Sequence, residues 1–203
     1  KGGEKKTIRV LFSWYVPRSN MRLGTDACAC TCDTPLPTYE PWYAGRFGSV
    51  VDVAAYWHGN VARLHQESET FARTFYDTDL PAPVVEAIAA NLTILKSPTC
   101  LRQKDGRFWG WEGCCDHNGC CEGSCTHVWN YAQALAHLFP DLERSMRDTE
   151  FNENQDERGH QTFRAALPVR PVAHGFHAAA DGQLGGIMKA FREWRISADT
   201  EWL

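Results

Sequence analysis

The spacing of apolar residues changes once along the chain, from a period of two to a helical period. In residues 7–17, TIRVLFSWYVP, apolar side chains occupy every second position: Ile8, Val10, Phe12, Trp14 and Val16. This alternation is typical of a β-strand with one buried face. Because a single strand is not stable alone, we expect its sheet to lie upstream of this chain.

A helical pattern begins at residue 50. Positions spaced by four and three residues form one stripe, namely Val50, Ala54, Trp57, Val61, Leu64, Ser68, Phe71 and Phe75. The stripe predicts an amphipathic helix of roughly 26 residues, on the order of 40 Å long. Pro81 and Pro83 follow this helix, and Pro83 suits the first turn of a second one.

Further helices are predicted in the C-terminal half. Thr126 is a candidate cap for a helix with Val128, Tyr131, Leu135 and Leu138 on one face. Pro140 interrupts that helix, and the short helical segment DLERSMRDTEF follows. Asp181 is expected to cap a last helix whose apolar residues are Leu184, Ile187, Met188, Phe191 and Trp194.

Long irregular segments separate these elements. Residues 18–48, 96–125 and 152–180 are expected to be loops, with a possible strand at TFRAALPVR (residues 162–170). Asp199 or Thr200 is a candidate N-cap of a helix that would continue past Leu203. We therefore expect a mainly α fragment of a longer protein, with function carried on its loops.

Composition narrows the function classes. The net charge is −4 and no run of Lys or Arg exceeds two residues, so the basic face needed for nucleic-acid binding is not expected. No apolar run approaches the roughly 20 residues that cross a bilayer. The first ten residues lack the apolar region of a signal peptide, which favours a cytoplasmic location without establishing it. Eight Trp residues suit either a Trp-rich core or flat platforms for sugars.

The nine cysteines raise a metal-binding alternative. Three lie in CACTC (Cys28, Cys30 and Cys32), and five lie in the stretch WGWEGCCDHNGCCEGSCTHVWNY, residues 109–131. Its candidate zinc ligands are Cys114, Cys115, Asp116, His117, Cys120, Cys121, Cys125 and His127. Zinc sites usually combine two knuckles of Cys-x(2–4)-Cys spacing, and no second standard knuckle is present. Small buried thiols that pack a glycine-rich loop are the favoured interpretation.

The same stretch carries two candidate catalytic carboxylates. Glu112 lies in GWEGC beside an aromatic residue, and Glu122 lies in CCEGSC. Glycoside hydrolysis uses two carboxyl groups, about 5–5.5 Å apart in retaining enzymes and about 6.5–9.5 Å in inverting ones. Glu112 and Glu122 are one candidate pair, and an ordinary loop position is the other explanation for each.

Three long runs resemble the catalytic region of glycoside hydrolase family 116. They are LPAPVVEAIAANLTILKSPTC, GRFWGWEGCCDHNGCCEGSCTHVWNYAQALAHLFPDLERSMRDTEF and AADGQLGGIMKAFREWRISADTEWL. The segment YAGRFGSVVDVAAYWHGNVARL also looks like the family's passage from a β-sandwich into an (α/α)6 toroid. The resemblance implies that residues 1–45 are the edge of a sandwich domain with a linker. It implies that residues 46–203 are the N-terminal part of a toroidal catalytic domain.

The resemblance also implies site residues. Glu112 would be the nucleophile of a retaining β-glycosidase, and the general acid/base Asp would lie beyond Leu203, so the fragment alone would be inactive. Thr126 and His127 would contact sugar hydroxyls, although an Asp found near Thr126 in animal members is missing here. His174 and His177 compete for one further substrate contact. Trp111, with Trp109 and Trp129, would wall the sugar site or pack the core.

The resemblance leaves several properties open. No metal or organic cofactor is implied, and the partner would be a small-molecule or oligosaccharide β-glycoside. Glucosides, xylosides, N-acetylglucosaminides and lipid aglycones all occur in the family, so the substrate is not fixed. The oligomeric state is also undetermined. The alternative function is a non-catalytic zinc-binding interaction module built on Cys114–Cys125.

Overall fold

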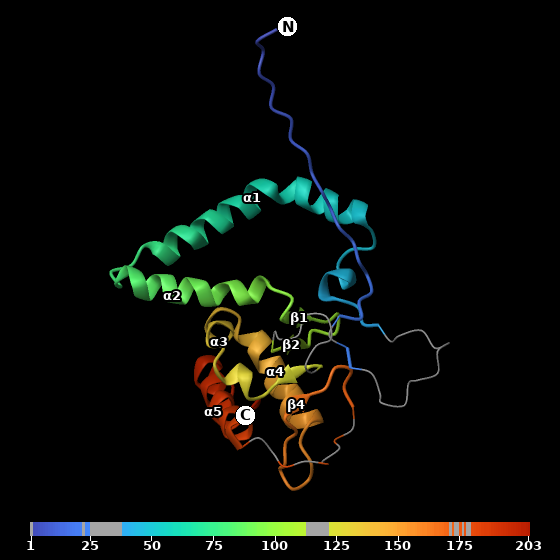
Figure 1. Cartoon of the computed structure of the whole chain (residues 1–203), viewed down its shortest axis with the longest axis vertical. Helices are drawn as coiled ribbons and strands as arrows, with labels where there is room; N and C mark the ends of the chain where they lie inside the picture. The colour runs from blue at the N-terminus through green and yellow to red at the C-terminus, as the bar shows by residue number, and fades with distance from the viewer. Residues whose placement is uncertain are drawn as a thin grey trace.

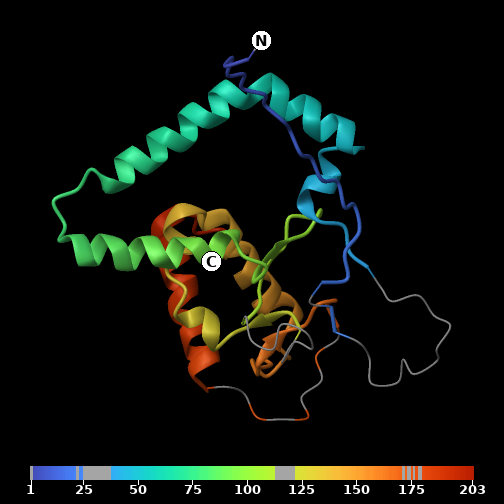
Figure 2. The same cartoon turned by 45° about the horizontal axis from the view of Figure 1, so that its top comes forward.

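The computed structural model describes residues 2–21, 23–24, 38–112, 122–170, 172, 175, 177 and 180–203. Within these ranges the chain is mainly α-helical, with a few short antiparallel strands. Figure 1 shows two long helices, α1 (Val50–Tyr76) and α2 (Ala82–Leu92), above a compact part that holds most of the other elements. The two helices run in nearly opposite directions and diverge from the turn that joins them, as Figure 2 also shows.

Both long helices form where the sequence predicts them. Ser49 caps α1, because its side-chain oxygen accepts a hydrogen bond from Asp52 N at 3.2 Å. α2 carries Pro83 in its first turn, as expected. None of the residues of α1 is buried, and Val85 is the buried residue of α2. The apolar stripe of α1 therefore lies largely on the surface of the described chain.

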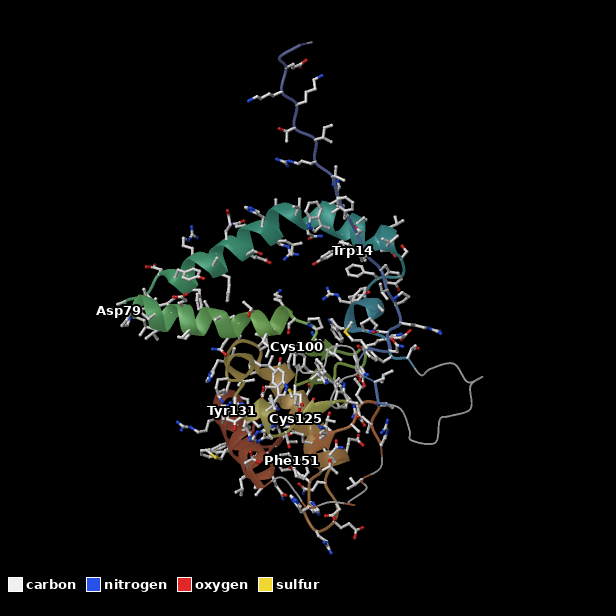
Figure 3. The ribbon with its side chains drawn as sticks, in the orientation of Figure 1. Trp14, Asp79, Cys100, Cys125, Tyr131 and Phe151 are labelled. Carbon is white, nitrogen blue, oxygen red and sulfur yellow. The ribbon has the colours of Figure 1, made fainter. Side chains whose placement is uncertain are left out.

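The strand predicted for residues 7–17 has no partner within the described chain, as expected if its sheet lies elsewhere, so it stays a prediction. The segment is extended but pairs with no strand among the described residues, and its apolar side chains, including Ile8, are exposed. Figure 3 shows Trp14 on this segment, which leads away from the compact part. Side-chain hydrogen bonds attach its end: Tyr43 Oη contacts both Val16 N and Val16 O at 2.7 Å. A strand requires a neighbouring backbone, and the described chain supplies none here.

The segment 96–125, expected to be a loop, contains a β-hairpin. After the 3₁₀-helix η2 (Thr93–Lys96), β1 (Cys100–Arg102) pairs antiparallel with β2 (Phe108–Gly110). Strands of three residues are too short to show the alternation of apolar and polar side chains from which strands are predicted, so the sequence did not indicate them. A second short pair joins β3 (Ser124–Cys125) to β4 (Arg164–Ala165), which lies inside the possible strand at 162–170.

The third predicted helix is only partly formed. A 3₁₀-helix, η3 (Val128–Asn130), comes first, and the short helix α3 (Ala134–Leu138) follows. Thr126 does not cap a helix: its hydroxyl donates to Phe163 O at 2.9 Å. Thr126 directly follows β3, so its side chain faces Phe163, the residue that precedes β4. α4 (Pro140–Glu153) then begins at Pro140, in agreement with the interruption predicted there.

Strand β2 separates two groups of core residues. Successive strand residues point to opposite faces, so Phe108 packs with Trp129, Leu135 and Met146, whereas Trp109 packs with Ala165 and Leu167. Gly110 follows, and a Cβ at this position would lie 2.0 Å from the Trp129 ring. The absence of a side chain at Gly110 therefore lets the indole lie directly against the strand.

Helix α5 (Ala180–Ser197) exposes most of the apolar residues that the sequence places on it. Leu184, Ile187, Met188 and Phe191 are each more than half exposed, while Gly182, Gly186, Lys189 and Glu193 are buried. The helix also starts at Ala180, so Asp181 lies in its first turn and is not its cap. The helix forms where it was predicted, and its buried face is the glycine- and charge-bearing one.

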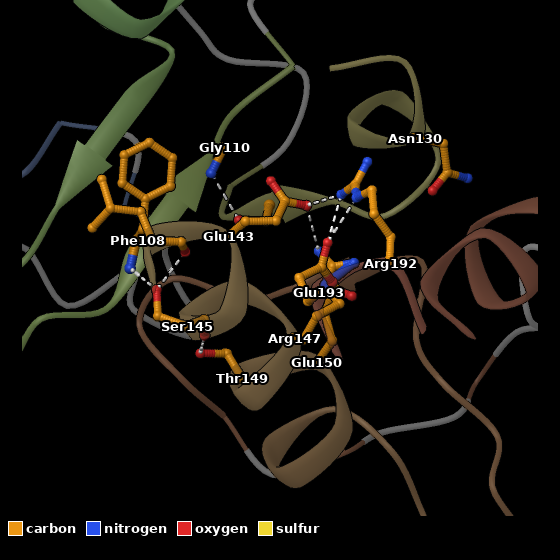
Figure 4. A network of polar contacts seen from close by, with 12 residues as sticks. Phe108, Gly110, Asn130, Glu143, Ser145, Arg147, Thr149, Glu150, Arg192 and Glu193 are labelled. Atoms are coloured by element: carbon orange, nitrogen blue, oxygen red, sulfur yellow. Dashed lines mark hydrogen bonds and ion pairs between the residues drawn. The ribbon is translucent and has the colours of Figure 1, made fainter. Parts of the chain in front are cut away.

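Charged side chains fill the contact between α4 and α5. Arg147 Nη2 donates to Glu150 Oε1 at 2.8 Å, and Arg192 Nη2 donates to Glu193 Oε1 at 2.6 Å and to Glu143 Oε1 at 3.2 Å (Figure 4). Glu143, Arg147, Glu150 and Glu193 are almost completely buried. Isolated buried charges are costly, so these groups are kept in the interior by pairing with one another.

Candidate functional site

Glu112 lies two residues beyond the end of β2. The hydrogen bond from Trp111 N to Thr99 O, at 2.7 Å, continues the alignment of the hairpin past its last paired residues. The backbone before Glu112 is therefore fixed by the β1–β2 pair. The Glu112 side chain is 17% exposed, so its carboxylate is mostly enclosed and still open to a small molecule.

An arginine from a distant segment contacts this carboxylate. Arg164 Nη2 donates to Glu112 Oε2 at 2.5 Å, and the Arg164 side chain is 24% exposed. Arg164 belongs to β4 and pairs with Cys125 of β3. Two strand pairs thus carry the two members of this ion pair.

A pocket of about 170 Å³ opens beside Glu112. Glu112 and Gln133 are among its polar lining residues. Aliphatic side chains make up half of the lining, and Trp111, Trp129 and Tyr131 are its aromatic members; Trp129, at 1% exposed, presents only an edge. Trp111 is only 2% exposed, so its ring belongs to the core and contributes an edge of the pocket, whereas Tyr131 is 71% exposed. Figure 3 places Tyr131 at the outside of the compact part. An aromatic pocket with one enclosed carboxylate is suited to a small ligand with an apolar face.

Thr126 and His127 lie against the beginning of α5. A Cβ at Gly182 would be 2.4 Å from Thr126 Oγ1, so only glycine permits this close packing. The ring nitrogen Nδ1 of His127 contacts Asp181 Oδ2. This hydrogen bond lowers the pKa of Asp181 below its usual value, with a further contribution from the Gly182 N–H.

His177 reaches the same region through Phe163. The two rings are 5.5 Å apart between centroids, and Phe163 O accepts the hydrogen bond from Thr126. Because Phe163 precedes Arg164, the structure brings Thr126 and His177 to the segment that also carries the partner of Glu112. His127 follows Thr126 but turns its ring to Asp181 of α5. His174, the competing histidine, lies outside the described residues.

Glu122 has a partner of its own. Arg170 Nη1 donates to Glu122 Oε1 at 3.2 Å, which parallels the pair of Arg164 and Glu112. Glu122 is not among the residues that line the pocket beside Glu112. Two arginines of the segment 164–170 therefore hold the two glutamates that flank residues 113–121.

Most of the predicted zinc ligands, from Cys114 to Cys121, lie outside the described residues, as do Cys28, Cys30 and Cys32. Among the residues that the structure does describe, no group of three or more His, Cys, Asp or Glu side chains is arranged to hold a metal ion. Cys125 is buried, and its sulfur accepts a hydrogen bond from Val128 N at 3.4 Å. Burial raises the pKa of the Cys100 thiol to about 11. Figure 3 shows Cys100 and Cys125 in the compact part.

Two residues of this region were missed by sequence reasoning. Arg164 was part of a possible strand, and Asp181 was taken only as a helix cap. Their partners, Glu112 and His127, are 52 and 54 residues away in sequence. No local pattern reports such pairs, because they depend on the tertiary packing of β4 and α5.

No protein-family model matches the chain, and no curated protein matches its sequence. Among the described helices, none combines the length and the hydropathy needed to span a membrane.

Proposed function

We propose that the chain is part of a retaining β-glycosidase in which Glu112 is the nucleophile. The supporting observation is the position of Glu112, a mostly enclosed carboxylate at the edge of an aromatic pocket, oriented by Arg164. The pocket is smaller than the roughly 300–1,000 Å³ of drug-sized ligand sites, which suits a single sugar ring. The resemblance to glycoside hydrolase family 116 supplies the reaction class, with glucosides as the first substrates to test.

The neighbouring residues have consistent roles in this proposal. Tyr131 and the edge of Trp111 would contact the apolar face of the sugar ring. With Nδ1 of His127 bound by Asp181, the Nε2 atom is left to contact a sugar hydroxyl. The Thr126 hydroxyl already donates to Phe163 O, so its oxygen would act towards substrate as an acceptor. His177 and His174 would contribute from the segment before α5.

The proposed reaction has two displacements. A Glu112 carboxylate oxygen attacks the anomeric carbon, and the bond from that carbon to the leaving oxygen breaks as a general acid protonates it. Water then attacks the same carbon, gives its proton to the same residue acting as base, and releases the Glu112 carboxylate. The acid/base Asp is proposed to lie beyond Leu203. The (α/α)6 toroid and the preceding sandwich belong to the same proposal.

The test compares two glutamates that differ in their surroundings. In the full-length protein that carries this sequence, Glu112→Gln should reduce turnover of an aryl β-glucoside by on the order of 10³-fold or more, because the covalent step is lost. Glu122→Gln removes the same charge from the other ion pair and should keep most of the activity. A mechanism-based β-glucoside inactivator should label Glu112. Labelling of Glu122, or of neither residue, would refute the assignment.

A further inference from the structure

Arg164 and Glu112 are carried by one connected frame of short strands. β2 is joined to β3 by the hydrogen bond from Gly110 N to Ser124 Oγ, at 2.9 Å. β3 is in turn paired with β4 through Cys125 and Arg164. The Thr162 hydroxyl donates to Arg164 O at 2.6 Å and fixes the backbone further. The strand pairing and these two side-chain hydrogen bonds therefore hold the backbone on both sides of the ion pair.

The arginine is well placed to control the direction of the carboxylate. Its Nη2 atom holds Oε2 of Glu112, and both side chains are at least three-quarters covered, which limits screening by water. Arg164 Nη1 is buried and has no hydrogen-bond partner among the described residues. A planar guanidinium with a fixed backbone leaves the carboxylate few alternative orientations.

We propose that Arg164 is the positioning residue of the Glu112 nucleophile, and this inference rests on the glycosidase function proposed above. Arg164 has a different role in each of the two displacements. In the first, it orients the carboxylate towards the anomeric carbon. In the second, the bond from that carbon to the Glu112 oxygen breaks, the electron pair returns to the carboxylate, and the adjacent guanidinium stabilises the charge that forms.

The first displacement can be isolated with a fluorinated dinitrophenyl β-glucoside inactivator. Dinitrophenolate leaves without being protonated, so the result does not depend on the general acid. The bond from Glu112 to the anomeric carbon forms, the bond to the aryl oxygen breaks, and the electron pair leaves with dinitrophenolate. Its release gives the rate constant of inactivation and the binding constant separately, and mass spectrometry of peptides locates the label.

The expected results separate orientation from general structure. Arg164→Met should reduce the inactivation rate constant by about 100-fold while the binding constant changes by less than about threefold, because the misplaced nucleophile loses its attack geometry. Arg164→Lys, which keeps the charge without the fork, should lie between the wild type and Arg164→Met. Reactivation of the labelled protein by water should also be slower in Arg164→Met, by about tenfold or more.

Arg170→Met is the matched control. It removes the same charge from the same segment and breaks the ion pair to Glu122, so its inactivation rate constant should stay within about threefold of the wild type. Guanidinium ion, below the concentration that unfolds the protein, should restore inactivation of Arg164→Ala by about tenfold, and should not accelerate Arg170→Ala. The rescue keeps the proposal testable if Arg164→Met folds poorly.

Two failures are distinguishable. If the wild type is labelled at Glu112 but Arg164→Met reacts at the same rate, or if guanidinium rescues nothing, Arg164 does not position the nucleophile. If the wild type is not labelled at Glu112 at all, the glycosidase proposal fails, and the positioning role fails with it.

Discussion

Lys189 provides a prediction about stability that is independent of catalysis. This residue of α5 is 4% exposed and its ammonium nitrogen has no hydrogen-bond partner among the described residues. Burial lowers its pKa from 10.5 to about 8, with a smaller contribution in the same direction from Arg147. Three glutamates of the α4–α5 contact, Glu143, Glu150 and Glu193, oppose the shift without cancelling it.

The shift fixes both the sign and the size of a pH effect. Between pH 8 and 10.5 the folded protein has lost the Lys189 proton, while the unfolded chain still holds it. Unfolding then takes up a proton, so the free energy of unfolding rises with pH in this window. At about 1.4 kcal/mol per pKa unit, the full effect is about 3 kcal/mol. Below pH 8 both states are protonated and Lys189 contributes no slope.

Lys189→Met removes this titration. At neutral pH the variant should be more stable than the wild type by about 1–3 kcal/mol, because an imperfectly paired buried charge is replaced by an apolar side chain. This advantage should shrink by about 3 kcal/mol between pH 8 and 10.5, as the wild type loses its buried charge. Lys189→Arg keeps a charge throughout this range, so it should lack the slope and retain the low stability.

Urea unfolding of the three proteins across this pH range measures the effect. The comparison between variants is needed because Cys100 acts in the opposite direction. Burial raises its pKa from 9.0 to about 11, so its contribution to the free energy of unfolding falls as pH rises between these values. That contribution is common to all three proteins and cancels in the differences. Parallel pH curves for the wild type and Lys189→Met would refute the assigned shift.

Two further predictions follow from packing and burial. Gly110→Ala should lower the free energy of unfolding by about 1–3 kcal/mol, because its methyl group would overlap the Trp129 ring. Gly59→Ala should raise the free energy of unfolding by about 0.5–1 kcal/mol, because a Cβ there meets no atom and alanine favours the helix interior more than glycine does. Urea unfolding checks both, and equal effects would contradict the packing argument. At pH 9, alkylation of Cys100 should be about 50-fold slower in the folded protein than in urea, as measured by mass spectrometry. The reason is that a thiol with a pKa of about 11 is almost fully protonated at pH 9, whereas the unfolded thiol, with its ordinary pKa of 9.0, is about half thiolate. Equal rates would contradict its burial.

The position of Glu112 shows how far local sequence information reaches at the candidate site. The aromatic and glycine neighbours marked it as a candidate, and the structure encloses it beside a pocket with aromatic walls. Locally, Glu112 differs from Glu122 only by its aromatic neighbour, since both precede a glycine. In the structure both pair with an arginine, so the ion pairs do not separate them either. The distinction comes from the pocket, which is formed by α2, η2, η3 and α3 together.

The sequence by itself determined the elements whose signal is local. The four-and-three spacing predicted α1, Pro83 marked the first turn of α2, and Pro140 marked the interruption after which α4 begins. These features depend on backbone geometry within a few residues of each position. They hold whatever the helix later packs against.

Only the tertiary structure decided which faces are covered and which distant charges meet. α5 turns a glycine- and charge-bearing face towards α4 and leaves its apolar face exposed, although its period is as predicted. Residues 7–17 have the alternation of a strand and no partner among the described residues. The contact of Arg164 with Glu112 depends on two strand pairs. A period fixes the spacing of side chains along one element, but burial and ion pairing are properties of at least two elements, and no single stretch of sequence contains both.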